Sequence, residues 1–185
     1  NALDVCDDGS VLDAAEDGVR RLAIDGNGVV TDTGETLSVA NPMNVYCVPG
    51  SRSGVVVTWD GTVQSFALPG LAPVDSRPLW GAGISGVVSS AGDRVYVRSS
   101  YDGYVDAFSY DAGTGTLGAD PLYTIPVDAA TGFFGMEQMA LNANANTFYV
   151  PQEGALGVYD ARSGAPLTTI TDPHIVYPTG VVIAP

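Results

Sequence analysis

Lysine is absent from this sequence. All seven basic residues are arginine, against 21 acidic residues, so the formal net charge is −14. A surface of this sign repels nucleic acid and anionic membranes and attracts cations or basic partners. We therefore expect no nucleic-acid partner. Most of the acidic residues are expected to serve solubility, because a high net charge keeps small domains apart in solution.

Long apolar runs, cysteine and histidine are also scarce. No run of about 18 apolar residues occurs, so no segment predicts a membrane-spanning helix. The chain begins at Asn1 with neither Met nor a signal-like segment, which predicts a processed or excised chain. Two cysteines, Cys6 and Cys47, are too few for a disulfide scaffold or a four-ligand zinc site, and a single histidine cannot form a paired-histidine metal site.

Apolar residues and turn formers are abundant instead. Apolar residues make up 45% of the chain and charged residues 15%, with 23 glycines and 12 prolines. This composition is typical of an all-β protein with short strands, and the length suits one domain over residues 1–185. The lysine-poor, Gly/Thr/Ser/Asp-rich composition favours a secreted bacterial protein, which predicts an extracellular, periplasmic or cell-surface location.

One unit repeats along the chain. The segments "GVRRLAIDGNG", "GTVQSFALPG", "GYVDAFSYDAGTG" and "GALGVYDARSG" align so that Leu22, Phe66, Phe108 and Tyr159 fall in register, about 40 to 50 residues apart. A strand and a tight polar turn precede each aligned segment, and a more polar strand follows it. A fourth strand, such as "NPMNVYCVP" at 41–49, begins each unit. The sequence thus predicts four strands per repeat.

Four antiparallel strands in each repeat of this length are the signature of β-propeller blades. The predicted blades cover approximately residues 1–40, 41–81, 82–128 and 129–173, and "YPTGVVIAP" at 177–185 adds one extra inner strand. Three arrangements fit this count: a closed four-bladed ring, half of a dimeric eight-bladed ring, or a fragment of a seven- or eight-bladed ring. Aromatic residues that alternate along the strands (Phe66, Phe108, Tyr159, Tyr96 and Tyr149) are expected to pack between blades.

Short motifs add a resemblance to a known family. Tyr96-Val97, Tyr149-Val150, Tyr159-Asp160 and the turn Thr114-Gly115-Thr116-Leu117 resemble the YVTN and lactonase-like β-propeller repeats, whose fold is that of 6-phosphogluconolactonase. The resemblance implies the fold and, for an activity, hydrolysis of a sugar lactone. Those enzymes have six to eight blades, so the four predicted here depart from the pattern.

In propellers, the loops that lead into the innermost strands form the rim of the central channel, where ligand groups converge. The aligned rim positions are 41–44, 84–86, 134–138 and 177–180. The polar residues at these positions that we predict to bind a ligand are Asn41, Asn44, Ser85, Gln138, Tyr177 and Thr179.

Few residues suit catalysis. Glu137 is the only carboxylate at the predicted rim and is a candidate general base, and His174, in the loop before the last strand, could reach the same rim. Arg77 is a candidate for binding an anionic lactone. No G-x-S-x-G motif is present, so a nucleophilic serine has no local support.

Calcium is the only metal that the sequence suggests. Asp4, Asp7 and Asp8 in "DVCDDGS" offer oxygen ligands, although the EF-hand spacing is missing. Cys6 and Cys47 occupy matching positions of neighbouring inner strands. Packed sheets lie about 10 Å apart, which is too wide for a disulfide unless the blades converge near the channel, so we expect two buried free thiols.

Two functions fit these observations. The favoured one is a non-enzymatic, secreted or surface-exposed propeller that acts as a binding or assembly module, with a protein or carbohydrate ligand at the rim and a homodimer as one possible assembly. The alternative is a lactonase-like hydrolase of a sugar lactone. Trp59 and Trp80 lie in or beside turns, where stacking on a sugar is possible, but nothing in the sequence aligns them on one surface.

Overall fold

A computed structural model describes residues 2–99, 103–127, 138–142, 147–176, 178, 180 and 181. In this part of the chain the strands form antiparallel sheets that follow one another along the sequence. The first two sheets have four strands each, which pair in chain order. The strands are β1 (Ala2–Val5), β2 (Val11–Ala15), β3 (Gly18–Ile24) and β4 (Val30–Leu37), then β5 (Pro42–Cys47), β6 (Ser53–Thr58), β7 (Thr62–Ala67) and β8 (Ala72–Pro78).

The next two sheets repeat the plan. In the third, the outer strand is broken by residues 118–122, so that both of its pieces pair with β11. The strands are β9 (Gly83–Val88), β10 (Arg94–Ser99), β11 (Tyr104–Asp111), β12 (Thr116–Leu117) and β13 (Tyr123–Pro126), then β14 (Ala140–Asn142), β15 (Thr147–Gln152), β16 (Ala155–Asp160) and β17 (Pro166–Ile170).

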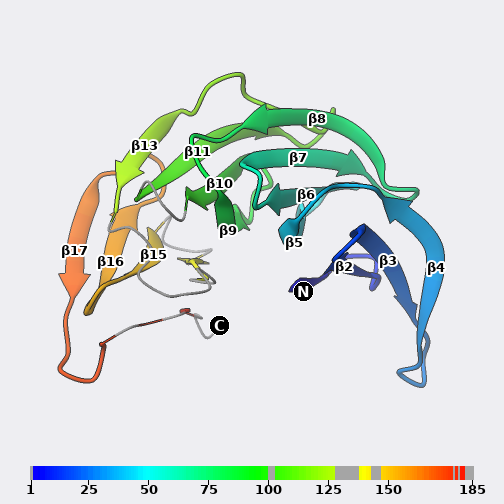
Figure 1. Ribbon diagram of the computed structural model, residues 1–185, viewed down its shortest axis with the longest axis horizontal. Coiled ribbons are helices and arrows are strands. Elements are labelled where there is room, and N and C mark those ends of the chain that lie inside the picture. The colour runs from blue at the N-terminus through cyan, green and yellow to red at the C-terminus, as the bar shows by residue number, and fades with distance from the viewer. Residues whose placement is uncertain are drawn as a thin grey trace.

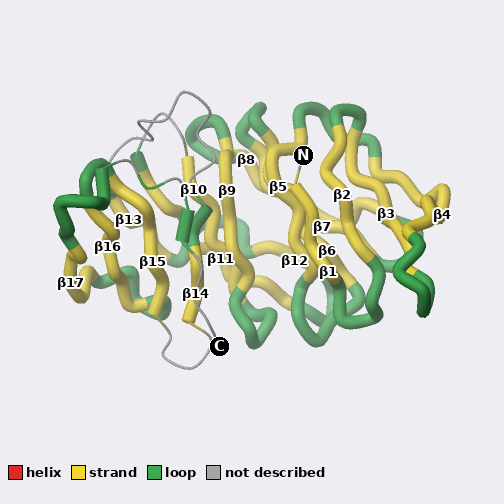
Figure 2. The backbone as a smooth tube through the Cα atoms, turned by 90° about the horizontal axis from the view of Figure 1, so that it is seen from below, coloured by secondary structure: helices red, strands yellow, loops and turns green. Residues whose placement is uncertain are grey.

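The sheets stand side by side in an arc (Figure 1). Strands β5 and β9 lie on the inner side of the arc, and β4, β8, β13 and β17 lie on the outer side. Figure 2 shows the same strands from below, with loops along two opposite edges of the molecule. Four antiparallel sheets that radiate from a common centre are the blades of a β-propeller, which confirms the predicted fold. In the part of the chain that the structure describes, the arc is open, and the first and fourth blades do not close a four-bladed ring (Figure 1).

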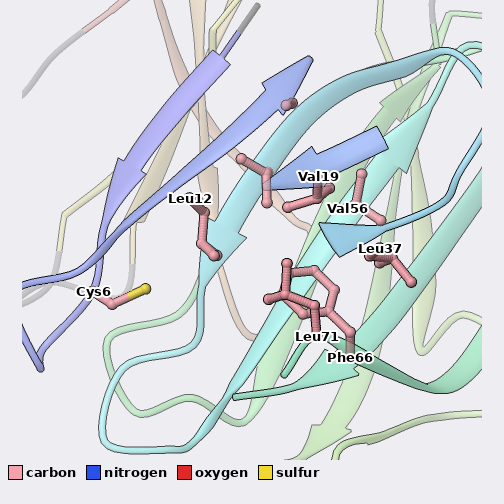
Figure 3. Close-up of a cluster of buried hydrophobic side chains, with 9 residues drawn as sticks. Cys6, Leu12, Val19, Leu37, Val56, Phe66 and Leu71 are labelled. Atoms are coloured by element: carbon pink, nitrogen blue, oxygen red, sulfur yellow. The ribbon is translucent and has the colours of Figure 1, made fainter. Parts of the chain in front are cut away.

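Apolar side chains fill the space between neighbouring blades. Leu12 and Val19 of the first blade meet Val56 and Phe66 of the second, and all four are fully buried (Figure 3). Similar clusters lie between the second and third blades and between the third and fourth. This packing follows from strand alternation, which turns every second residue toward the adjacent blade.

The predicted packing of aromatic residues between blades is confirmed for Phe66, Phe108, Tyr96 and Tyr159, which are all buried. The ring of Phe148 stacks between those of Tyr96 and Tyr159, with centroids 5.4 and 5.3 Å away. Tyr149 is only half-buried. It follows Phe148 on β15, so its side chain points to the opposite face, as strand geometry requires.

The prediction of free thiols is wrong, because Cys6 and Cys47 form a disulfide with their Cα atoms 5.3 Å apart. Cys47 ends β5 and Cys6 directly follows β1, and these two innermost strands contact each other. Blades converge toward the centre of a propeller, so their innermost strands lie much closer than the roughly 10 Å between packed sheet faces. The prediction assumed the spacing of about 10 Å between packed sheet faces, which applies to the outer strands of the blades and not to the innermost ones.

Within the described ranges, no helix is both long and apolar enough to cross a membrane.

Candidate functional site

The channel side of the first two blades contains a cavity of about 270 Å³. Strands β1 and β5 form most of its wall, and Gln138, just before β14, adds a side chain from the fourth blade. The lining residues are Ala2, Leu3, Asp4, Met43, Asn44, Val45, Tyr46 and Gln138. Two of the predicted ligand-binding residues, Asn44 and Gln138, therefore lie at one site.

The amides of Asn44 and Gln138 join three blades. Asn44 Nδ2 donates to the carbonyl oxygen of Ile84 at 2.6 Å, and Gln138 Nε2 donates to Asn44 Oδ1 at 3.2 Å. Asn44 is only 4% exposed, whereas Gln138 is exposed. Asn44 thus has mainly a structural role as the buried link between blades, and Gln138 is the member of the pair that a ligand can reach.

Asp4 and Tyr46 supply the other polar groups of the cavity. The Asp4 carboxylate accepts backbone hydrogen bonds from Cys47 at 2.8 Å and Val5 at 3.0 Å, yet its partial burial raises its pKa above the ordinary value. The Tyr46 hydroxyl accepts the Gly86 N–H at 2.7 Å, and burial raises the pKa of this hydroxyl as well. The phenol and the two amides carry no charge, and Asp4 is the one carboxyl among the described residues that line the cavity. Charged groups are therefore few in this cavity.

The remaining described rim residues lie apart from the cavity. Asn41 adopts a left-handed conformation with φ of 48°, and its Nδ2 donates to both carboxylate oxygens of Asp60 at 3.1 Å. Ser85 is fully buried in β9, where it pairs with Arg98 of β10. Asn41 is exposed and open to a ligand, whereas Ser85 is covered by the protein.

Three predicted site residues, Glu137, Tyr177 and Thr179, lie outside the described residues. The predicted inner strand at 177–185 does so as well, for the most part. Its described residues run beside the segment that precedes β14: Gly180 forms a parallel bridge with Gln138, and the Val181 N–H donates to the Gln138 carbonyl oxygen at 3.1 Å. The roles of these residues stay predictions.

His174 lies on the segment after β17, with its side chain 94% exposed. Its Nδ1 lies 2.7 Å from Asp172 Oδ1, and its backbone N–H donates to the same oxygen. This backbone hydrogen bond is the main reason why the pKa of Asp172 is lowered. His174 is not among the described residues that line the cavity, and its catalytic role stays a prediction.

Arg77 has a structural role. It lies on β8, an outer strand, where Nε donates to the Gly118 carbonyl oxygen at 2.9 Å and Nη2 donates to that of Leu117 at 2.7 Å. Its Nη1 pairs with Asp75, whose other carboxylate oxygen accepts the Leu117 N–H at 3.0 Å. The Arg77 guanidinium therefore joins the second blade to the third at their outer edge, away from the channel.

The three aspartates suggested for calcium do not converge. Asp4 binds the backbone of Cys47, and Asp7 accepts the Gly50 N–H at 2.8 Å. Asp8 pairs with Arg21 at 2.8 Å and accepts two hydrogen bonds from Ser10, which lower its pKa. Within the described ranges, no three potential metal ligands come together. This geometry does not support the calcium site.

Sequence reasoning missed Asp4 and Tyr46 as members of the channel cavity. The repeat alignment placed the site in the loops that lead into the inner strands, whereas these two residues lie within β1 and β5 themselves. Alternation along "NPMNVYC" could have shown that some side chains of this strand face the channel.

Comparison with known proteins supports the fold and adds no family. No protein-family model matches the chain, and no curated protein does. Among solved structures, a functionally unknown protein from Desulfotomaculum acetoxidans superposes with a TM-score of 0.77 at 23% identity, over 94% of this chain and 57% of its own. A candidate 6-phosphogluconolactonase from Bacteroides uniformis gives 0.76 at 15% identity, over 97% of this chain and 55% of its own.

The β-propeller domain of Myceliophthora thermophila Cps50 (Swd1) also superposes, with a TM-score of 0.68 at 12% identity, over 89% of this chain and 57% of that domain. The chain thus spans little more than half the length of these structures. Identities this low establish the fold alone, and the comparisons accordingly show a chain of β-propeller blades.

Proposed function

We propose that this chain is a binding and assembly module built from propeller blades, with a neutral polar ligand held at the channel side of its first two blades. The observation that carries the proposal is the channel cavity, to which three separate parts of the chain contribute. Amide, phenol and carboxyl groups converge there among apolar side chains, and this mixture is typical of binding sites for small polar ligands. An oligosaccharide is the first ligand class to test.

The groups at this site suit binding better than proton transfer. A general base must lie within reach of a reacting proton and have a partner that sets its pKa. The two carboxylate oxygens of Asp4 each accept a hydrogen bond from a backbone N–H group, and the Tyr46 hydroxyl accepts one from the Gly86 N–H. These contacts fix the two side chains in position, and a fixed site loses little entropy when a ligand binds.

The test is a glycan array followed by calorimetry on each glycan that binds. We expect Gln138→Ala and Asp4→Asn each to weaken binding by about fivefold, since a hydrogen bond contributes about 1 kcal/mol. Gln64→Ala is the matched control. Gln64 lies on β7, the third strand of its blade counted from the channel, so it does not line the cavity. Glycan binding that neither variant changes, or an array with no bound glycan, would contradict the proposal.

A second candidate function is lactone hydrolysis. The observations that favour it are the match to the candidate 6-phosphogluconolactonase over 97% of this chain and the resemblance to YVTN and lactonase-like repeats. In this reaction Glu137 would take a proton from water as the hydroxide attacks the lactone carbonyl carbon, and would return that proton to the ring oxygen as the ring C–O bond breaks, which gives a hydroxy acid and restores the carboxylate. A lactone panel assayed with wild type, Glu137→Gln and His174→Ala tests it. Activity that survives Glu137→Gln unchanged would sink the assignment of this base.

We also propose an extracytoplasmic location. The Cys6–Cys47 disulfide supports it, since disulfides persist in oxidising compartments and are rare in the cytosol. Thiol titration of the denatured protein, produced in the periplasm and in the cytosol of a bacterial host, provides the test. We expect no free thiol in the exported protein, and a fully reduced exported protein would contradict the proposal.

A further inference from the structure

A second pocket lies in the outer groove between the second and third blades, away from the channel. It has a volume of about 320 Å³ and lies where the segment after β8 faces strand β11 and the break in the outer strand of the third blade. Its walls are Pro78, Leu79, Trp80, Phe108, Ala119 and Pro121, together with the carboxylates of Asp106 and Asp120. The pocket therefore combines apolar walls with negative charge.

Trp80 forms an exposed aromatic wall. It is 82% exposed, the largest exposed fraction among the exposed large apolar side chains of the described residues. The segment that carries it is held in place, since the Leu79 N–H donates to the Gly61 carbonyl oxygen at 2.8 Å. Such exposure leaves a large apolar area in water, and an indole face attracts cations through its π electrons.

Asp106 supplies a buried carboxylate. It is 4% exposed and faces the second blade from β11, two residues before the buried ring of Phe108. Thr124 Oγ1 donates to its Oδ1 at 2.6 Å, and within the described chain its Oδ2 accepts no hydrogen bond. Burial raises the pKa of this carboxyl, because the charged form has lost its water. A cation at Oδ2 would offset that loss.

The described residues supply no cation to this pocket. None of the lining residues is basic, and the chain contains no lysine. Arg77, on the adjacent strand β8, directs its guanidinium to Asp75 and to the carbonyl oxygens of Leu117 and Gly118. Asp106 and Asp120 therefore stand as two negative charges beside an aromatic ring, with a net protein charge of −14 to attract a positive ligand.

We propose that this pocket binds an organic ammonium group, with the nitrogen at Asp106 and beside the indole of Trp80, and the alkyl chain against Leu79 and Phe108. Both a free amine and the lysine side chain of a partner protein carry this chemistry. A charge-assisted hydrogen bond to a buried carboxylate and a cation–π contact each favour the cation over a neutral molecule of the same shape. The site is separate from the channel cavity, so the two proposals stand or fall independently.

The experiment is a titration followed by two-dimensional ¹H–¹⁵N NMR of the tryptophan indole N–H groups. The chain has two tryptophans, and Trp59 lies outside the pocket lining, so its resonance serves as an internal control. The probes are n-butylammonium chloride, its neutral analogue 1-butanol, and methyl glucoside. A second arm compares acetyl-Gly-Lys-Gly-amide with the same peptide carrying norleucine, which separates a lysine side chain from a free amine.

We expect butylammonium to shift the Trp80 resonance and to bind at least about tenfold more tightly than 1-butanol, since a hydrogen bond to a charged group is stronger than one between neutral groups. Asp106→Asn should weaken this binding about tenfold and Trp80→Ala about fivefold, whereas Asp17→Asn and Trp59→Phe should leave it unchanged. A lysine peptide that binds where its norleucine analogue does not would identify a partner side chain as the source, and binding of butylammonium alone would identify a free amine.

Three results would overturn the proposal. Equal binding of butylammonium and 1-butanol would show that the pocket recognises the shape of the ligand and not its charge. Binding of methyl glucoside without butylammonium would make the pocket a sugar site. Binding unaffected by Asp106→Asn would remove the buried carboxylate from the site. The wild-type titration needs no variant, so the proposal remains testable even if a substitution unfolds the chain.

Discussion

Gly54 shows how tightly the side-chain cluster between the first two blades is packed. A Cβ atom at this position on β6 would lie 2.6 Å from Cε2 of Phe66 and 3.1 Å from Cδ1 of Leu12, inside the cluster between the first and second blades. The backbone of Gly54 has ordinary torsion angles, so the cost of a side chain there is steric. We expect Gly54→Ala to lower the free energy of unfolding by about 1–3 kcal/mol, the typical cost of overpacking a core.

Urea denaturation measures this change, with Gly26→Ala as the matched control. A Cβ at Gly26 would meet nothing within 4 Å, so the same substitution should change stability by less than about 0.5 kcal/mol. Equal effects at both positions would show that the interface between these blades is loose enough to accept an extra methyl group.

Asp106 gives a prediction about pH. Its folded-state pKa is raised by burial above the unfolded value, so ionisation disfavours the folded state. The resulting destabilisation is absent below the unfolded pKa, grows as the pH rises from that value through the folded pKa, and is complete above it. Asn cannot ionise and can still accept the Thr124 hydrogen bond. We therefore expect Asp106→Asn to unfold at a higher temperature than wild type at neutral pH.

Thermal melts from about pH 8 to about pH 3 provide the measurement, and the difference between the two proteins should shrink to zero at the acidic end. Asp17→Asn is the control, since Asp17 is exposed and its pKa is lowered by the hydrogen bond from Arg20. A stabilising effect of Asp106→Asn would mean that wild type keeps a buried carboxylate at the expense of stability, as binding sites often do. A destabilising effect at neutral pH would contradict this account.

At the scale of elements, the disulfide joins the first two blades at their inner ends. Cys6 and Cys47 are separated by 41 residues along the chain. Closing a loop of this length removes unfolded-state entropy equivalent to about 4 kcal/mol at room temperature. We expect the double variant Cys6→Ala/Cys47→Ala to lose about 2–4 kcal/mol of stability in urea denaturation. Dithiothreitol should destabilise wild type by a similar amount and leave the double variant unchanged. Equal stability of the two proteins would show that the blades hold this geometry without the disulfide.

The outer edges of the second and third blades are joined by Arg77. Its guanidinium donates to two carbonyl oxygens of the third blade and pairs with the partly buried Asp75, contacts that a single ammonium group cannot all reproduce. We expect Arg77→Lys to lower stability by about 1–2 kcal/mol. Arg20→Lys is the control, because Arg20 forms an exposed pair with Asp17 and such pairs contribute about 0–1 kcal/mol. Equal small effects would mean that Arg77 contributes no more than a surface ion pair.

The elements also show what a sequence reveals and what it does not. Strand alternation and polar turns recur locally, so the four blades and the burial of Phe66, Phe108, Tyr96 and Tyr159 could be predicted from the repeat. The Cys6–Cys47 disulfide could not, because it depends on how closely the inner strands converge. Arg77 was a candidate for substrate binding because of its charge alone, whereas its actual partners are Asp75 on the same strand and two carbonyl oxygens of the third blade. The pocket at Trp80 could not be predicted from the sequence, because Asp106 reaches it from strand β11 and Asp120 from the break in the outer strand.

At the scale of the whole molecule, the described residues form an open arc in which no other described blade covers one face of the first blade (Figure 1). On β1, Ala2 and Asp4 point toward the second blade, where Ala2 packs against the core and Asp4 binds Cys47. The alternate residues Leu3 and Val5 therefore point away from it, and both are 66% exposed. Ile24 and Val30, paired across β3 and β4, are exposed as well. Soluble monomers rarely leave several apolar side chains on one sheet face uncovered, so such a face usually packs against a partner.

We propose that a second copy of this chain covers that face. The described residues form four sheets, and two copies related by a twofold axis would supply enough blades to close one ring. The first blade of each copy would then pack against the fourth blade of the other, whose outer strand β17 exposes Leu167 and Ile170. This arrangement would enclose the channel and place two copies of the cavity at Asp4 and Gln138 on its wall.

Light scattering coupled to gel filtration tests the proposal by giving the mass in solution. We expect a mass twice that of the 19.0 kDa chain, and the double variant Ile24→Asp/Val30→Asp should shift it to that of one chain, because buried carboxylates at the contact would repel and lose their water. Leu122→Asp is the control, since Leu122 is equally apolar and exposed but belongs to the third blade, which already has a neighbour on each side. A wild-type protein that stays monomeric at every concentration would refute the dimer, and binding of a hydrophobic dye lost in the Ile24→Asp/Val30→Asp variant would then show that the face is exposed to solvent.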